Sequence, residues 1–393
     1  MNRVFSAGWR VFFWAAGLWA VAAMAVWLFW LATQASGGDA ILNLPMAAQG
    51  WHAHEMIFGF AAAALGGFFL TAVPNWTGAK AAPERFIALV AGLWLAGRLV
   101  IWFSAILPPW LVAVVDLAFL PVLGAKILTQ LLARPKPQNM LFLLLLSMVW
   151  AGNLMVHLDW MGLAQTGWQG TRGGLLAVCA MIAVLGGRVT PAFTRNAMLR
   201  EGREDRLPVS HAPLDRAGIV LSIVTPLAVL AALPDAWAGV LALVTGLVAA
   251  ARLAGWRGLA LPGQPIVWAL HLGYGMLALG LILWGLAGLG IGSEIGGLHV
   301  LAIGAVGGMT LAVMSRATIG HSGRELVAPG PVALAYGLMP LAVVLRWCAA
   351  EWPGMMYYTG TIASGLIWIA AFALYLVALW PIWFAPRAGQ GGA

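Results

Sequence analysis

Twelve long apolar segments follow one another along the 393-residue chain, and they constrain its fold more than any other feature. A helix needs about 20 apolar residues to cross the ~30 Å hydrocarbon core of a bilayer. Because the segments are continuously apolar, they predict helices rather than the alternating strands of a transmembrane barrel. The segments lie near 11–33, 52–73, 85–106, 110–132, 138–158, 173–190, 216–233, 237–254, 265–288, 298–317, 330–350 and 356–384.

Charged residues make up 9% of the chain, too few for a surface that faces water. Of the 21 Lys and Arg residues, 17 fall in the terminal segments and the even-numbered connections, whereas Arg172 and Arg346 fall on the other side. Basic residues concentrate on the cytoplasmic side of membrane proteins. The sequence therefore predicts an all-α, polytopic integral membrane bundle of 12 transmembrane helices with both termini cytoplasmic. We expect it in the bacterial cytoplasmic (inner) membrane, and its basic charge requires no nucleic-acid partner.

The longest polar segment, 191–215, joins the sixth and seventh apolar segments and is predicted to be a cytoplasmic loop. No convincing repeat relates the two halves that it separates. We therefore expect residues 1–393 to form a single transmembrane domain.

The seven histidines are distributed between two depths of the predicted bundle. Four lie at the outer face: His52, His54, His157 and His299. His271 and His321 lie toward the inner face, and His211 lies in the polar loop. His299 and His321 are separated by about 33 Å if the segment is helical, so they cannot share a metal ion. Because imidazole ligates metals and haem iron, the sequence predicts two sites, one near each face.

The stretch WHAHEMIFGF opens the second segment and combines two histidines with Glu55. His52, Gly59 and Gly66 are spaced seven apart, which leaves a strip without side chains for either a flat macrocycle or a closely packed helix. His54 points about 200° away from His52 on a regular helix. Glu55 follows His52 by three positions and is placed to orient it or to pass protons. The alternative is that each histidine only forms hydrogen bonds at the membrane interface.

Two charged residues lie deep in adjacent apolar segments. Arg98 and Asp116 are each nine positions from Leu107, so an antiparallel hairpin places them at equal depth. Membrane-embedded charges are functional candidates, but the spacing predicts a structural ion pair equally well. Asn153 precedes His157 by four positions, on the same helix face, and is a candidate partner for it.

Several motifs resemble those of the NnrS family, membrane proteins described as containing haem and copper and linked to nitric-oxide metabolism. They are WHAHEMIFGF followed by FFLTAVPNWTG, then GGRVTPAFTRN, ALHLGYGML and LHVLAIGAVGGMTLAVMSRATIGHSGR, in order between residues 51 and 324. The resemblance implies a twelve-helix protein that protects cells from nitric oxide or supports denitrification. It marks ten motif positions: His52, His54, Glu55, Arg188, Arg195, His271, His299, Arg316, His321 and Arg324.

Our leading hypothesis is a membrane protein with haem b and copper that binds or transforms nitric oxide, with electrons from a membrane donor if it is a nitric-oxide reductase-like enzyme. Glu55 would handle protons as the catalytic residue. The outer metal would be held by His52, His54 and His299, with His157 as a further ligand. The inner centre would be held by His271 and His321, with Arg188, Arg195, Arg316 and Arg324 around its propionates. The alternatives are a transporter of haem, copper or a small anion, and a non-catalytic protein that handles nitric oxide or iron–nitrosyl species.

Overall fold

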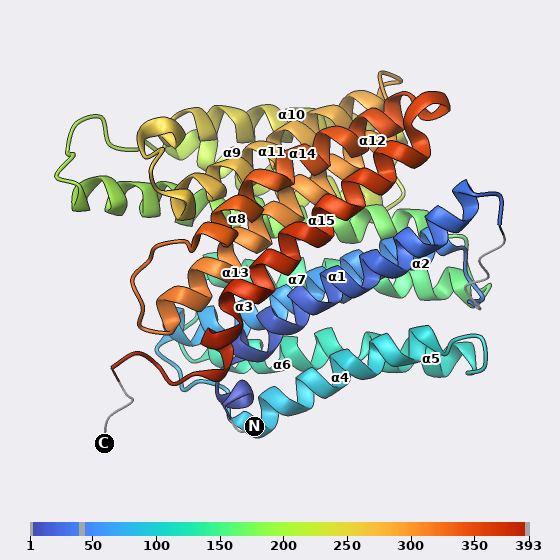
Figure 1. Cartoon of the computed structure of the whole chain (residues 1–393), viewed down its shortest axis with the longest axis horizontal. Helices are drawn as coiled ribbons and strands as arrows, with labels where there is room; N and C mark the ends of the chain where they lie inside the picture. Colours follow the sequence, from blue (N-terminus) through green and yellow to red (C-terminus); the bar gives the residue numbers. More distant parts are fainter. Residues whose placement is uncertain (1–2, 39–43, 390–393) are drawn as a thin grey trace. The chain divides into compact units, whose positions relative to one another are not determined.

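The structure is a computed structural model that describes residues 3–38 and 44–389. Helices are the only regular elements of this described part (Figure 1). Twelve of them are long and apolar enough to cross a membrane, which confirms the predicted number. The spans are α1 (Gly8–Ala35), α2 to α3 (Ala48–Thr77), α4 (Glu84–Trp102), α5 and α6 (Pro109–Leu132), α7 (Pro137–Trp160), α8 (Gly167–Arg200), α9 (Ala212–Leu230), α10 extended to Ala260 (Asp235–Ala260), α11 (Pro265–Gly288), α12 to α13 (Glu294–His321), α14 (Gly330–Glu351) and α15 (Pro353–Phe384).

The connection between the sixth and seventh spans is shorter than the predicted 191–215. Helix α8 continues through Pro191 to Arg200, and α9 begins at Ala212. The extension has an apolar side, since Ala197 and Met198 are buried. The residues that join the two helices are therefore 201–211.

Two spans contain a π-helical segment. In the second span, α2 (Ala48–His54) passes into η2 (Glu55–Ala61) and then α3 (Ala62–Thr77). In the tenth, α12 (Glu294–His299) passes into η4 (Val300–Gly307) and then α13 (Gly308–His321). Such segments are rare and occur often at functional sites. Each of these follows directly after a histidine.

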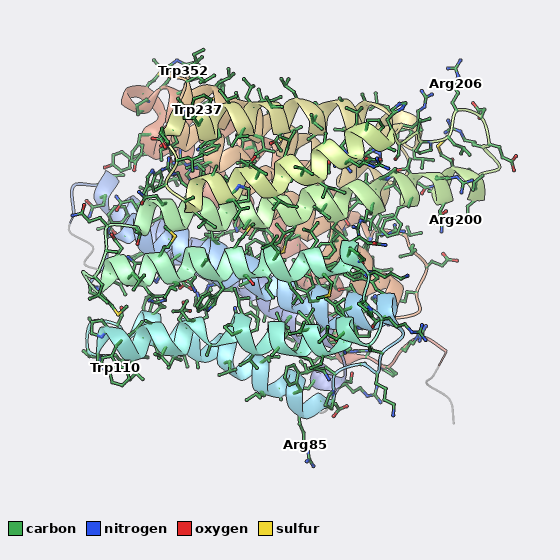
Figure 2. All side chains as sticks on the ribbon, turned by 180° about the vertical axis from the view of Figure 1, so that it is seen from behind. Arg85, Trp110, Arg200, Arg206, Trp237 and Trp352 are labelled. Atoms are coloured by element: carbon green, nitrogen blue, oxygen red, sulfur yellow. The ribbon has the colours of Figure 1, made fainter. Side chains whose placement is uncertain are left out.

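The chain divides into two compact units. Unit 1 comprises Met1–Gly174, Ala317–Glu325 and Tyr375–Ala393, and unit 2 comprises Leu175–Arg316 and Leu326–Leu374. Within unit 1, Arg85 lies at one end of the hairpin of α4 and α5 and Trp110 at the other (Figure 2). Within unit 2, Arg200 and Arg206 lie at one end of the helices and Trp237 and Trp352 at the other (Figure 2).

Arg10 joins the first and last helices of unit 1. Its guanidinium nitrogen Nη1 donates to the backbone oxygens of Ile382, Trp383 and Ala385 at 3.1, 2.6 and 3.0 Å. These oxygens lie at the C-terminal end of α15, where carbonyl groups lack helical partners and the helix dipole is negative. One buried arginine thus caps the last helix from the first.

Candidate functional site

Six polar side chains converge inside unit 1, each at most 5% exposed. They come from four spans and include two histidines, two carboxylates and one arginine. The members of this cluster, which we call the Asp116 cluster, are His54, Glu55, Arg98, Asp116, Asn153 and His157. Buried charges are tolerated only when they are paired and hydrogen-bonded, so the partners of each group decide what the cluster can do.

His54 and Glu55 enter the cluster at the junction of α2 and η2. Although they are adjacent in sequence, both are buried, and His54 Nδ1 lies 3.0 Å from Glu55 Oε1. Trp19 of α1 donates its indole N–H to the other carboxylate oxygen, Oε2, at 2.8 Å. Glu55 therefore contacts His54 and not His52, the partner that the helical spacing predicted.

Arg98 of α4 bridges the two carboxylates. Its Nη1 lies 2.7 and 2.8 Å from the two oxygens of Glu55, and its Nη2 donates to Asp116 Oδ1. The ion pair of Arg98 with Asp116 confirms the prediction made from their equal depth in the hairpin. The guanidinium of Arg98 also forms an ion pair with Glu55. The equal depth of Arg98 and Asp116 does not predict this second ion pair.

The second oxygen of Asp116 is the centre of the cluster. Asp116 Oδ2 lies 2.9 Å from His157 Nε2 and 3.2 Å from His54 Nε2, and it accepts a hydrogen bond from Asn153 Nδ2 at 2.8 Å. The oxygen of Asn153 lies 2.9 Å from the same nitrogen of His54. Asn153 and His157 share one face of α7, as their spacing of four predicts. Two imidazole nitrogens therefore face one carboxylate oxygen.

Aromatic rings close the space around the two imidazoles. Trp160 lies 4.9 Å from the ring of His54 and 5.4 Å from that of His157, measured between centroids. Phe58 packs on His54 from the side of η2, at 5.3 Å. These apolar walls exclude water and so strengthen the electrostatic interactions inside.

The formal charges leave the cluster with an unbalanced negative charge when both histidines are neutral. Arg98 contributes one positive charge, whereas Glu55 and Asp116 contribute two negative charges. A buried net charge is costly. Either a proton on an imidazole or a metal cation would balance it.

The donor set fits a metal ion. One ligand atom from each of His54, Asp116 and His157 can be chosen so that all lie within 4.8 Å of one another. This is the one group of at least three such side chains within residues 3–38 and 44–389. The other ring nitrogen of His54 faces Glu55, and histidine ligands characteristically donate that N–H to a carboxylate.

The other two predicted outer histidines are not members of this group. The ring of His52 stacks on Trp27, with centroids 4.5 Å apart and planes inclined by 16°. His299 belongs to unit 2, where its Nδ1 lies 2.8 Å from the Ile295 carbonyl of its own helix. Within unit 1, His54 and His157 are thus the two predicted outer ligands that the fold brings together.

The predicted inner residues are divided between the units. His321 lies in unit 1 and stacks on Trp9 at 6.4 Å, whereas His271 lies in unit 2. Arg316 stacks its guanidinium on the ring of Phe193 at 3.9 Å. Of the remaining arginines, Arg188 is half-buried in α8, and two are exposed, Arg195 and Arg324.

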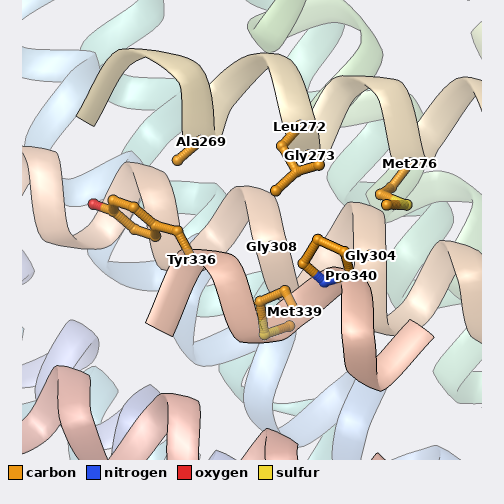
Figure 3. A pocket seen from close by; sticks show the side chains of 9 residues that line it. All are labelled: Ala269, Leu272, Gly273, Met276, Gly304, Gly308, Tyr336, Met339 and Pro340. Carbon is orange, nitrogen blue, oxygen red and sulfur yellow. The ribbon is translucent and has the colours of Figure 1, made fainter. Parts of the chain in front are cut away.

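His271 does not offer a free nitrogen to haem iron in this arrangement. Its Nδ1 lies 3.2 Å from the Val267 carbonyl, and its Nε2 lies 3.2 Å from the Trp256 carbonyl and 3.3 Å from Thr194 Oγ1. A cavity along α11 is lined by Ala269, Leu272 and Gly273 together with residues of η4, α13 and α14 (Figure 3). That cavity is narrow, with room for about one water-sized sphere. It does not accommodate a porphyrin.

The sequence indicated the members of the Asp116 cluster as candidate residues, but it did not predict that they contact one another as one group. It treated Arg98 and Asp116 as a separate ion pair and did not identify Trp19 or Trp160. The available signal was the depth of the polar residues: Asp116 and Asn153 lie inside apolar segments, where polar side chains need partners, and His157 lies one turn from Asn153.

Comparison with known proteins gives one family match. The family model described as NnrS protein matches residues 3–387, nearly the whole chain. No curated protein matches the chain.

Proposed function

The chain belongs to the NnrS family, and from this membership and the Asp116 cluster we propose that it is a membrane metalloprotein acting in nitric-oxide metabolism or defence against nitrosative stress. The observation that carries the proposal is the approach of two imidazole nitrogens to one carboxylate oxygen. His157 Nε2 and His54 Nε2 lie 2.9 and 3.2 Å from Asp116 Oδ2. Two imidazoles and a carboxylate are the ligand set of metal sites that keep open positions.

Each remaining member of the cluster has a role in holding these ligands. With a metal ion bound, Glu55 would accept the Nδ1–H of His54 and leave Nε2 as the ligand atom. Arg98 holds Oδ1 of Asp116, so Oδ2, which also accepts a hydrogen bond from Asn153, is the oxygen that would ligate the metal. A metal ion bound here would supply an open position for nitric oxide.

Glu55 is also our candidate for proton handling. It touches His54 on one oxygen, and its other oxygen accepts the indole N–H of Trp19. A carboxylate in contact with an imidazole can exchange a proton with it. Copper is consistent with the imidazole donors, whereas the haem b and the membrane electron donor rest on the family resemblance.

The first experiment is metal analysis of detergent-purified protein, together with its visible spectrum before and after reduction and under nitric oxide. The variants are Asp116→Asn, His157→Ala and His299→Ala. We expect the first two to lose the metal and the third to retain it. A folded Asp116→Asn protein with the wild-type metal content would refute this site. Sharp reduced bands of a b-type haem would establish the second cofactor.

The charge balance favours transport as the second candidate. Without a metal, the cluster lacks one positive charge, which a proton on His54 or His157 would supply. Membrane-embedded clusters of this kind occur in proton-coupled carriers. Metal-free protein that accumulates a substrate in vesicles along a proton gradient would support transport. Metal-loaded protein that binds nitric oxide without consuming it would indicate a non-catalytic role.

A further inference from the structure

The tenth span repeats the second span in detail. In both, a short helix ends at a histidine, a π-helical segment follows, and an α-helix is followed within two residues by a glycine with positive φ. The matching residues are separated by the same interval of 245 positions: His54 and His299, Gly59 and Gly304, and Gly78 and Gly323. Three coincident positions and the same order of elements indicate that the two spans are structural counterparts.

The hairpin that follows is repeated as well. In unit 1, α4 carries the buried Arg98, and a Cβ atom on Gly97 would lie 2.8 Å from Oδ1 of Asp116 on α5. In unit 2, α14 carries the buried Arg346, 8% exposed, and is followed by α15. Each arginine follows its histidine by nearly the same number of residues. Arg346 is therefore the counterpart of Arg98.

The contacts between α14 and α15 identify the residue of α15 that lies level with Arg346. A Cβ atom on Gly360 of α15 would lie 3.1 Å from the carbonyl oxygen of Leu345. One turn further along, Ser364 Oγ donates to the Ala342 carbonyl at 2.7 Å. Thr361, beside Gly360, consequently lies level with Arg346, in the place that Asp116 takes in unit 1.

The counterpart cluster has kept the arginine but has no acid. Glu55 corresponds to Val300 by the common interval, and Asp116 corresponds to Thr361 by register. Within the described part of the chain, Arg346 forms neither an ion pair nor a hydrogen bond, and its Nη1 is buried without an acceptor. The Thr361 hydroxyl, 5% exposed, also has no partner in these residues.

A buried cation without a counter-charge is strongly unfavourable, and a buried hydroxyl without a partner adds to the cost. Both groups can donate hydrogen bonds, so a negatively charged acceptor would satisfy them together. The guanidinium fork matches planar oxyanions in a bidentate manner. We propose that Arg346 and Thr361 form a binding site in unit 2 for a small planar oxyanion, for which nitrite and nitrate serve as probes. The site is independent of the metal centre proposed for unit 1.

The test is thermal unfolding of purified protein in dilute Tris-chloride buffer, titrated separately with sodium nitrite, sodium nitrate and further sodium chloride. The wild-type midpoint should rise and saturate with nitrite or nitrate, and respond less to spherical chloride. Arg346→Met should abolish the rise, yet should melt no lower than wild type without the anion. Thr361→Val should weaken the apparent affinity about fivefold, the loss of one hydrogen bond. Arg85→Met, at an exposed arginine, should respond as wild type does.

Three results would overturn the proposal. The first is a wild-type midpoint that no anion raises. The second is the same saturable rise in Arg346→Met as in wild type. The third is stabilisation that depends on Arg346 but appears only in nanodiscs containing phosphatidylglycerol, since the acceptor would then be a lipid phosphate. If Arg346→Met does not fold, the affinity of Thr361→Val decides, and an unchanged value contradicts the proposal.

Discussion

Replacing Arg98 with methionine should destabilise the protein severely. The guanidinium is 3% exposed and is the one cation among the described residues that contacts both Glu55 and Asp116. Removing one partner of a buried ion pair costs about 3–5 kcal/mol, and here the loss leaves two carboxylates without their cation. Arg98→Met should therefore lower the folded-to-unfolded ratio by about 10²–10⁴-fold.

Equilibrium unfolding in mixed detergent micelles, followed by circular dichroism, measures this loss. The matched variant is the same substitution at Arg346, which has no carboxylate partner and should cost little or nothing. A second comparison is the triple variant Glu55→Gln, Arg98→Met and Asp116→Asn. It removes the uncompensated charges and should recover much of the stability. The reasoning fails if Arg98→Met costs less than about 1 kcal/mol, or if the triple variant is no more stable than the single one.

Other perturbations test the surroundings of the cluster. His157→Ala should reduce bound metal, whereas His211→Ala, at an exposed loop position, should not, as metal analysis of both proteins would reveal. Treatment with a chelator should lower the melting temperature of the wild type and have no effect on His157→Ala. Gly152→Ala would bring a Cβ to 2.6 Å from a carbonyl oxygen of α8 and should cost about 1–3 kcal/mol. Gly124→Ala, whose new Cβ has its nearest neighbour at 3.5 Å, is the control for melting temperature. Trp19→Phe removes one N–H donor to a buried carboxylate and should cost about 1.5–3 kcal/mol by chemical unfolding.

Much of this architecture could be predicted because the membrane restricts the choices. Length and continuous apolarity indicate the number of spans, and both are local properties of the sequence. The pairing of Arg98 with Asp116 could be predicted for a related reason. Two residues at equal distances from a tight turn must lie at equal depth, and neither charge is stable alone in an apolar environment.

The association of His54 with Glu55 could not be predicted from helical periodicity. Regular α-helical spacing places Glu55 near His52, and the prediction followed that spacing. The π-helical segment that begins at Glu55 changes the number of residues per turn, so the faces computed from a regular helix no longer apply. The contacts of Asp116 with His157 also depend on packing between α5 and α7, which no local pattern encodes.

The metal-site prediction rests on depth in the membrane, which does not show which of the histidines contact one another. The same depth along the membrane axis is predicted for His52, His54, His157 and His299. Depth is only one of the three coordinates that fix a position. Their positions around the helices and between units depend on tertiary packing. Whether His52 or His299 takes part in metal binding therefore stays a prediction, to be tested by the metal content of their alanine variants.

The bonds from Arg10 to the end of α15 have a consequence for biosynthesis. Every member of the Asp116 cluster has left the ribosome by the time residue 157 has, together with the first helix. The carbonyls of Ile382, Trp383 and Ala385 appear only after all the spans between α1 and α15 have been translated. Arg10 acquires these acceptors only when α15 is in place, so a chain that stops before α15 would present an unsatisfied cation. Such a defect would mark incomplete chains for membrane quality control.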